Sequence, residues 1–107
     1  MKKKLTTEED YRQRVDRVCM YIREHLDKEI DMRRLAVLSA FSPFHFHRIM
    51  RAYLKEPIGA FIIRTRVETA AKLLRYTDLP VADIAYRVGY DTPSSLTKSF
   101  CKFFGIS

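Results

Sequence analysis

The sequence predicts an all-α fold, and three observations support that prediction. Apolar residues recur at three- and four-residue intervals along almost the whole chain, and no sustained alternation of apolar and polar residues indicates a strand. Only three glycines and four prolines interrupt the 107 residues. Because 47% of the residues are hydrophobic, the chain is long enough for one helical domain or two very small subdomains.

The first two helices are predicted from their N-terminal caps. Thr6 and Glu9 have the spacing of a capping box, so the first helix is expected to follow Thr6 and to end near Leu26. Asp31 is the expected N-cap of a short helix through "MRRLAVLSA". Both helices carry apolar residues on one face, which is typical of a helix that packs against a core.

The next two helices each begin beside a proline. Ser42 followed by Pro43 is an N-cap with a proline in the first turn, which predicts a helix over about 43–55. Pro57 opens the longest helix, which is expected to end near Tyr76. One face of this helix is apolar and the opposite face is basic, so we expect a rigid spacer of about 19 residues, roughly 28 Å long.

The last two helices repeat the arrangement of the second and third. A short helix, "VADIAYRV", is expected to end at a Gly89 cap. Thr92 and Pro93 repeat the cap and the first-turn proline, and they predict a helix over about 93–104 that stops at Gly105. A short helix, a turn and a longer capped helix therefore occur twice, about 50 residues apart, which is the helix-turn-helix pattern.

The longer helix of each pair has one apolar face and one polar face. Positions separated by three, four or seven residues share a face of a helix. Neither 43–55 nor 93–104 contains an acidic residue, although solvated faces usually mix both signs of charge. The predicted binding faces comprise Phe44, His47, Arg48, Arg51 and Lys55 on the first of these helices and Ser94, Ser95, Lys98 and Lys102 on the second.

The overall charge agrees with a polyanionic partner. Lysine and arginine number 20 against 13 acidic residues, which gives a formal charge of +7 and a pI near 9.6. The second helix of a helix-turn-helix can enter the major groove, where donors in its N-terminal half meet base edges. These properties predict binding to double-stranded DNA.

Other kinds of site find little support in the sequence. His45 and His47 are two residues apart and point to different sides of a helix, which argues against a metal site. Cys19 and Cys101 have no paired spacing, so we expect reduced thiols without a zinc site or a disulfide. No catalytic motif is present, and we expect no enzyme activity, metal or cofactor. The lack of a signal sequence or membrane-spanning run predicts a cytoplasmic, nucleoid-associated protein with no membrane partner.

From about Ile22 to Ser107 the chain resembles the DNA-binding domain of the AraC/XylS family of bacterial transcription regulators. The resemblance rests on "LAVLSAFSPFHFHRIM", "RVETAAKLL", "VADIAYRVGY" and "FFGIS", which stand in the order and spacing of the family. It implies two homeodomain-like three-helix units joined by a long linker helix. It also implies that the helices at about 43–55 and 93–104 occupy successive major-groove segments on one face of the duplex.

The resemblance assigns roles to the predicted binding residues position by position. The base-reading positions correspond to Phe44, His47 and Arg48 on the first helix and to Ser94, Ser95 and Lys98 on the second. Arg48 is expected to contact guanine O6 and N7, with Lys98 in the equivalent place. The phosphate-holding positions are expected to be Arg51, Lys55 and Lys102, together with backbone N–H groups at the helix starts.

The expected boundaries are 1–55 for the N-terminal helix and first helix-turn-helix, 56–77 for the linker helix, and 78–107 for the second helix-turn-helix. Members of the family continue with a closing helix, so we expect the second unit to be truncated before it. This would leave apolar residues partly uncovered, namely Phe103, Phe104 and Ile106. The resemblance further implies an activator that meets RNA polymerase, with any effector ligand bound by a domain absent from this chain.

Two other functions remain open from the sequence. The basic faces could hold an acidic protein partner, or they could bind nucleic acid nonspecifically through charge alone. Two acid-free helices in a repeated unit suit two grooves and are unnecessary for a single protein patch. RNA is the weaker nucleic-acid candidate, because a helix fits poorly into the deep, narrow major groove of A-form RNA.

Overall fold

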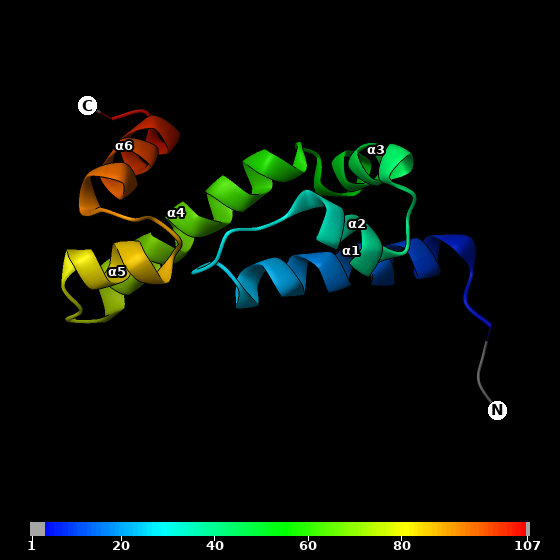
Figure 1. Ribbon diagram of the computed structural model, residues 1–107, viewed down its shortest axis with the longest axis horizontal. Helices are drawn as coiled ribbons and strands as arrows, with labels where there is room; N and C mark the ends of the chain where they lie inside the picture. The colour runs from blue at the N-terminus through cyan, green and yellow to red at the C-terminus, as the bar shows by residue number, and fades with distance from the viewer. Residues whose placement is uncertain (1–3, 107) are drawn as a thin grey trace. The chain divides into compact units, whose positions relative to one another are not determined.

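The computed structural model describes residues 4–106 and confirms the all-α prediction (Figure 1). The described residues form six helices and no strand: α1 (Thr7–Glu24), α2 (Met32–Ser39), α3 (Pro43–Leu54), α4 (Ile58–Tyr76), α5 (Val81–Arg87) and α6 (Pro93–Phe104). Within this part of the chain, none of the helices is both long and apolar enough to span a bilayer.

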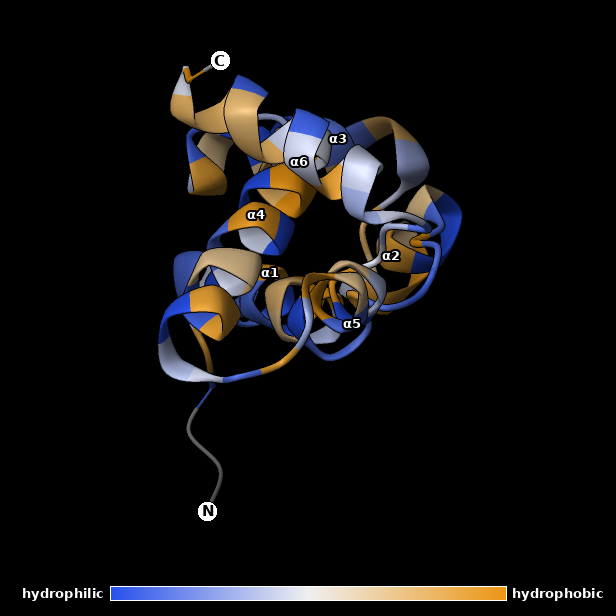
Figure 2. Ribbon diagram, turned by 90° about the vertical axis from the view of Figure 1, so that its left-hand side faces the viewer, coloured by the Kyte–Doolittle hydropathy of each residue, from blue (hydrophilic) through white to orange (hydrophobic). Residues whose placement is uncertain are grey.

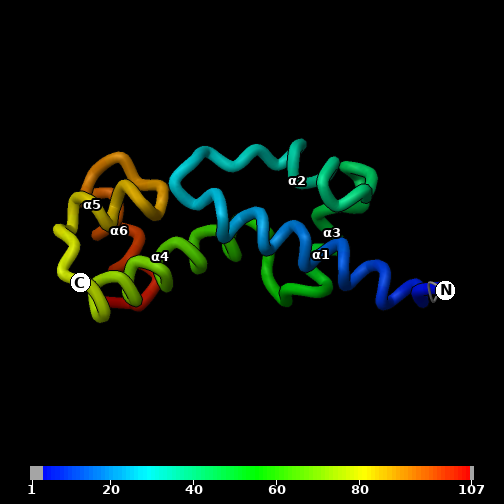
Figure 3. The backbone as a smooth tube through the Cα atoms, turned by 90° about the horizontal axis from the view of Figure 1, so that it is seen from below, coloured from blue at the N-terminus to red at the C-terminus, as the bar shows by residue number. Residues whose placement is uncertain are grey.

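The chain packs into two compact units. The first contains the residues up to Glu24 together with Ile30–Ile58, and so holds α1, α2 and α3. The second contains the residues from Gly59 onward, and so holds α5, α6 and all but the first residue of α4. It also includes His25–Glu29, the loop that follows α1. In Figure 3, α5 and α6 can be followed back beside the C-terminal half of α4.

The core of the first unit comes from one face of each of its helices. It comprises Val15, Val18, Cys19 and Ile22 of α1, Leu35 and Ala36 of α2, Phe41 of the following turn, and Phe46 and Met50 of α3. Figure 2 shows such apolar residues as orange bands along the helices, beside blue hydrophilic ones. Burial raises the pKa of the Cys19 thiol, which keeps it protonated and poorly nucleophilic.

The predicted caps of α1 and α2 are formed. The hydroxyl oxygen of Thr6 accepts from the Glu9 N–H at 3.1 Å, and the same hydroxyl donates to Glu9 Oε1 at 2.8 Å. Asp31 Oδ1 accepts from the Arg33 N–H at 2.9 Å, which satisfies a free donor at the start of α2. α1 ends at Glu24, two residues before the expected end, because Leu26 already belongs to the loop that packs in the second unit.

The start of α3 is as predicted, and its end differs by one residue. Ser42 is the N-cap, and its Oγ accepts from the His45 N–H at 3.3 Å. The helix ends at Leu54 instead of the predicted position 55. Lys55 has left the helical conformation with φ 64°, and its N–H bonds to the Arg51 carbonyl at 2.9 Å.

Arg14 of α1 donates hydrogen bonds to backbone carbonyls of the turn between α2 and α3. Its Nε donates to the Ser39 carbonyl at 2.7 Å, and its Nη2 donates to the Ala40 carbonyl. Its Nη1 lies 3.2 Å from Asp10 Oδ2, and its guanidinium carbon lies 4.0 Å from the centre of the Phe41 ring. Both carbonyls stand at the C-terminal end of α2, where helical N–H donors run out. Arg14 therefore fixes the turn from which α3 departs.

We expect Arg14→Met to destabilise the first unit by about 2 to 3 kcal/mol, because two carbonyls lose a charged donor while the stacked apolar chain is kept. Amide hydrogen exchange of α2 and α3 measures this loss in the first unit alone. The matched control is Arg12→Met: Arg12 is exposed and lies 5.4 Å above the Tyr53 ring, so we expect less than about 1 kcal/mol. Equal losses in the two variants would contradict a special role for the Arg14 bonds.

The core of the second unit joins α4, α5 and α6. It comprises Ala70 of α4, Ile84 and Ala85 of α5, Val88 of the following turn and Leu96 of α6. Three half-buried side chains pack around it, Leu73, Leu79 and Tyr90. This core holds the buried face of α6 in place and leaves the opposite face of that helix open.

The end of α5 is a tight turn that requires glycine. The helix ends at Arg87 with Val88 as its C-cap, so Gly89 is the residue after the cap instead of the cap itself. The Gly89 N–H bonds to the Tyr86 carbonyl at 3.1 Å, and the Tyr90 N–H bonds to the Ala85 carbonyl at 2.9 Å. This pair of bonds is a Schellman motif, with Gly89 at φ 95°.

Candidate nucleic-acid interface

The predicted residues of α3 lie together on its exposed face. Phe44, His47, Arg48 and Arg51 are all exposed, and so is Lys55 directly after the helix. On the other side of the helix, Phe46 is 1% exposed. Because α3 advances 100° per residue, the exposed set falls within about a third of the helix circumference. The sequence-based division of this helix into a packed face and an open face is confirmed.

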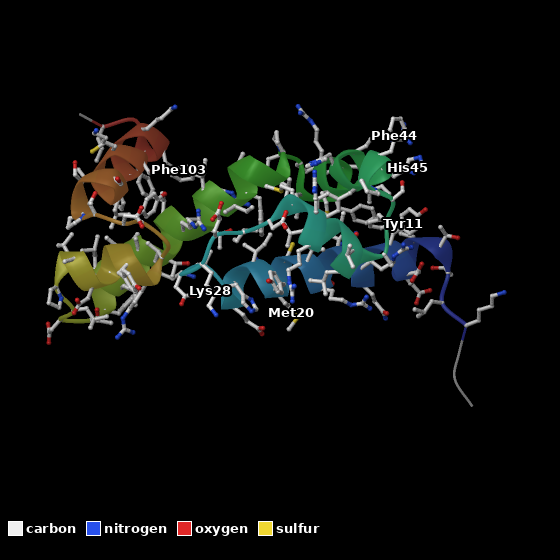
Figure 4. The ribbon with its side chains drawn as sticks, viewed as in Figure 1. Tyr11, Met20, Lys28, Phe44, His45 and Phe103 are labelled. Carbon is white, nitrogen blue, oxygen red and sulfur yellow. The ribbon has the colours of Figure 1, made fainter. Side chains whose placement is uncertain are left out.

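The N-terminal turn of α3 is capped by Ser42 and begins with a proline. Pro43 occupies its first turn, and the Ser42 hydroxyl lies 2.9 Å from His45 Nδ1 in addition to its backbone bond. The ring of Phe44 meets that of His45 edge-on, with centroids 5.2 Å apart. Phe44 is nevertheless 83% exposed, and Figure 4 shows it pointing away from the ribbon. A large aromatic side chain is thus left open to solvent at the start of α3.

A hollow of about 390 Å³ adjoins the start of α3. Its lining includes Tyr11, Phe41 and Ile49, and it reaches the side chains of His45 and Arg48. Figure 4 shows Tyr11 on the same side of the first unit as Phe44 and His45. Arg48 therefore has space beside it in which its long side chain can change direction.

The predicted residues of α6 also lie on an exposed face. Ser94, Ser95, Lys98 and Lys102 are exposed, whereas Leu96 is 3% exposed and packs in the core. The Thr92 hydroxyl caps the Ser95 N–H at 3.1 Å and donates to Ser95 Oγ at 3.1 Å. The Ser95 side chain is thus partly engaged in the cap, and Lys98 is the longest donor in the N-terminal half of the face.

Two further residues lie along this face of α6. The caps and prolines of α3 and α6 align at an offset of about 50 residues, which places Thr97 opposite His47 and Cys101 opposite Arg51. Thr97 is exposed and Cys101 is half-buried. Thr97 is not among the residues predicted from the sequence, although the offset that aligns it with His47 was available there.

The C-terminal end of α6 exposes apolar surface, as expected. Phe103, Phe104 and Ile106 are 40%, 45% and 55% exposed. The Phe104 ring lies 4.6 Å from that of Phe100 and 5.1 Å from that of Phe103, measured between centroids. These aromatic side chains cover one another in part.

Comparison with protein families places most of the chain in one match. A family model described as "Helix-turn-helix domain" matches residues 35–107. The chain is 31% identical over 93 residues to the HTH-type transcriptional activator AarP of Providencia stuartii, which covers 87% of this chain and 69% of AarP. It is 35% identical over 92 residues to the F1 operon positive regulatory protein of Yersinia pestis, covering 85% of this chain.

The chain is shorter than most of these relatives. It spans 31% of the length of the Yersinia pestis protein and 32% of the regulator YbfP of Bacillus subtilis, to which it is 31% identical. Among solved structures, it is similar to the DNA-binding domain of AdpA in complex with a target DNA. The TM-score is 0.78 and the identity 29%, over 87% of this chain and 84% of that one.

Proposed function

Because the chain belongs to the AraC/XylS type of helix-turn-helix DNA-binding domains, we propose that it recognises a specific double-stranded DNA site through α3 and α6. The observation that carries the proposal is the pair of exposed, acid-free faces on two capped helices at equivalent places of a repeated unit. Helices of this kind present their N-terminal residues to base edges in the major groove. The whole protein would then be a bacterial transcription regulator.

On α3, the proposed base readers are Phe44, His47 and Arg48. The Arg48 guanidinium suits guanine O6 and N7, the commonest specific contact in the major groove. The exposed Phe44 ring suits a thymine methyl, which is the apolar group of the groove. On α6, Lys98 occupies the position equivalent to Arg48. Ser94 and Ser95 are also proposed to contact bases, with shorter side chains.

The remaining cations are proposed to hold phosphates. Arg51 follows Arg48 along the same face of α3, Lys55 lies directly after that helix, and Lys102 is an exposed cation in the last turn of α6. Backbone N–H groups at the starts of α3 and α6 add uncharged donors to phosphate oxygens. These contacts fix position and supply a large part of the affinity without selecting a sequence.

We propose that α3 and α6 enter successive major-groove segments of one duplex. The 19 residues of α4 give a helix about 28 Å long, and one turn of DNA is about 34 Å. A modest bend of the DNA would accommodate the difference. A single chain would then bind a site without two-fold symmetry.

We further propose that the regulator acts as an activator in the cytoplasm, associated with the nucleoid and in contact with RNA polymerase. Two relatives support the sign of regulation by their names, a transcriptional activator and a positive regulatory protein. Any effector would bind through another domain.

The test is a competition between a duplex selected from random DNA and bulk DNA, at two salt concentrations. We expect the selected duplex to bind at least about 10³-fold more tightly, the lower range of specific recognition. Arg48→Ala should abolish most of this preference while nonspecific binding persists. Arg75→Ala, which removes the same charge from the last turn of α4, should retain it.

Equal binding of selected and bulk DNA, with the same steep salt dependence, would contradict the proposal and indicate counterion release alone. Absence of binding to either DNA would instead favour an acidic protein partner for the basic faces.

A further inference from the structure

The exposed faces of α3 and α6 differ in chemistry although their geometry is equivalent. At the two central positions α3 carries His47 and Arg51, whereas α6 carries Thr97 and Cys101. Two nitrogen donors are thus replaced by a hydroxyl and a thiol. The inference that follows rests on the proposed function and concerns the kind of base that α6 reads.

Thr97 presents a methyl group in place of a donor. Its Oγ donates to the Pro93 carbonyl at 2.9 Å, one turn back along α6. The hydroxyl proton is therefore used within the helix, and the hydroxyl is turned toward the backbone. Because Thr97 is exposed, its Cγ methyl is the group left to meet a partner.

Cys101 extends this apolar strip along the helix. It lies four residues after Thr97, so the two side chains are about 40° apart around the axis. A reduced cysteine behaves as a small hydrophobic residue and is at most a weak donor. No cation reaches outward from this position, as Arg51 does on α3.

We propose that Thr97, with Cys101 beside it, reads the C5 methyl group of thymine in the half-site bound by α6. Threonine methyl groups are among the side-chain groups that contact thymine in the major groove. Lys98 would read the neighbouring base pair from the adjacent edge of the same face. The second half-site is thus selected by apolar contact with thymine, whereas the first is selected mainly by hydrogen bonds from Arg48.

Deoxyuridine provides the direct test, because it pairs like thymidine and lacks only the C5 methyl group. In the selected duplex, thymines are replaced one at a time, and the half-site of α6 is identified as the one where Lys98→Ala loses base discrimination. We expect at least one replacement in that half-site to weaken binding by about fourfold, the factor for one buried methyl group.

A matched pair of variants assigns the effect to Thr97. Thr97→Ser keeps the hydroxyl and removes the methyl, and it should bind thymidine and deoxyuridine equally. Thr97→Val keeps the methyl and removes the hydroxyl, and it should retain the wild-type preference. Replacements in the half-site of α3 should respond identically in all three proteins.

Retention of the thymidine preference by Thr97→Ser, or its loss in Thr97→Val, would overturn the inference. A selected half-site that contains no thymine, or none sensitive to deoxyuridine, would overturn it as well. In each of these cases the large preference for selected over bulk DNA would persist. Loss of that preference itself is the separate outcome that contradicts DNA recognition.

Discussion

Replacing Gly89 by alanine is expected to unfold the second unit while the first unit stays folded. A Cβ atom on Gly89 would lie 2.2 Å from the Leu26 carbonyl oxygen and 2.8 Å from Arg66 Nε. The first of these is a backbone atom, so the clash cannot be relieved by turning a side chain. The φ of 95° adds backbone strain for any residue with a Cβ. We expect a loss of at least about 4 kcal/mol, the range of exceptional single substitutions.

The other two glycines provide graded controls. Gly105 has φ 69° but no atom within 4 Å of the position that a Cβ would take, so Gly105→Ala should cost only about 1 to 2 kcal/mol of backbone strain. Gly59 has neither a positive φ nor a neighbour within 4 Å, and it lies in the first turn of α4. Gly59→Ala should leave stability unchanged or raise it by up to about 1 kcal/mol.

Amide hydrogen exchange distinguishes these outcomes, because it reports on each helix separately. Gly89→Ala should lose protection in α5 and α6 and keep it in α2 and α3. If Gly89→Ala and Gly105→Ala lowered the stability of the second unit by the same amount, the contact with Leu26 would be irrelevant. Backbone strain alone would then explain both losses.

Truncating Phe46 is expected to produce the largest loss in the first unit. Phe46 is 1% exposed and is the largest of the fully buried side chains. Phe46→Ala leaves a cavity behind α3, with an expected cost of about 3 to 5 kcal/mol. Since Phe46 anchors the helix that carries Arg48, specific DNA binding should fall in proportion to the unfolded fraction.

Phe44 is the matched control on the same helix. It is 83% exposed, so Phe44→Ala should change stability by no more than about 0.5 kcal/mol. It should nevertheless weaken binding to the selected duplex, because the proposed contact with a base is removed. Thermal unfolding and DNA binding measured on both variants separate the two roles. A Phe44→Ala variant that binds DNA normally would remove Phe44 from the interface.

The elements of the fold could be predicted because their signals are local. Thr6 with Glu9, Asp31, Ser42 and Thr92 each cap the helix that the sequence assigned to them, since a capping side chain acts within three residues of its own position. The open face of α3 could be predicted for the same reason, because helical periodicity decides which residues share a side.

The features that escaped prediction depend on residues distant in sequence. Nothing near Arg14 indicates that its guanidinium bonds the carbonyls of Ser39 and Ala40, which are about 25 residues away. The location of Gly89 against Leu26 is likewise a tertiary contact. At the candidate site, the role proposed for Thr97 depends on where its hydroxyl turns, which helical spacing does not reveal.

The loop His25–Glu29 has a consequence for how this architecture is divided. In the sequence this loop lies between two helices of the first unit, yet it packs in the second unit. There, Arg66 Nη2 donates to the Lys28 carbonyl at 3.0 Å, and Leu26 is 6% exposed. A fragment starting at Gly59 would lack this loop and would leave Arg66 without that acceptor. The repeat seen in the sequence is therefore not a repeat of two self-contained segments, because the residues from Gly59 onward complete their packing with a loop that lies between α1 and α2 in the sequence.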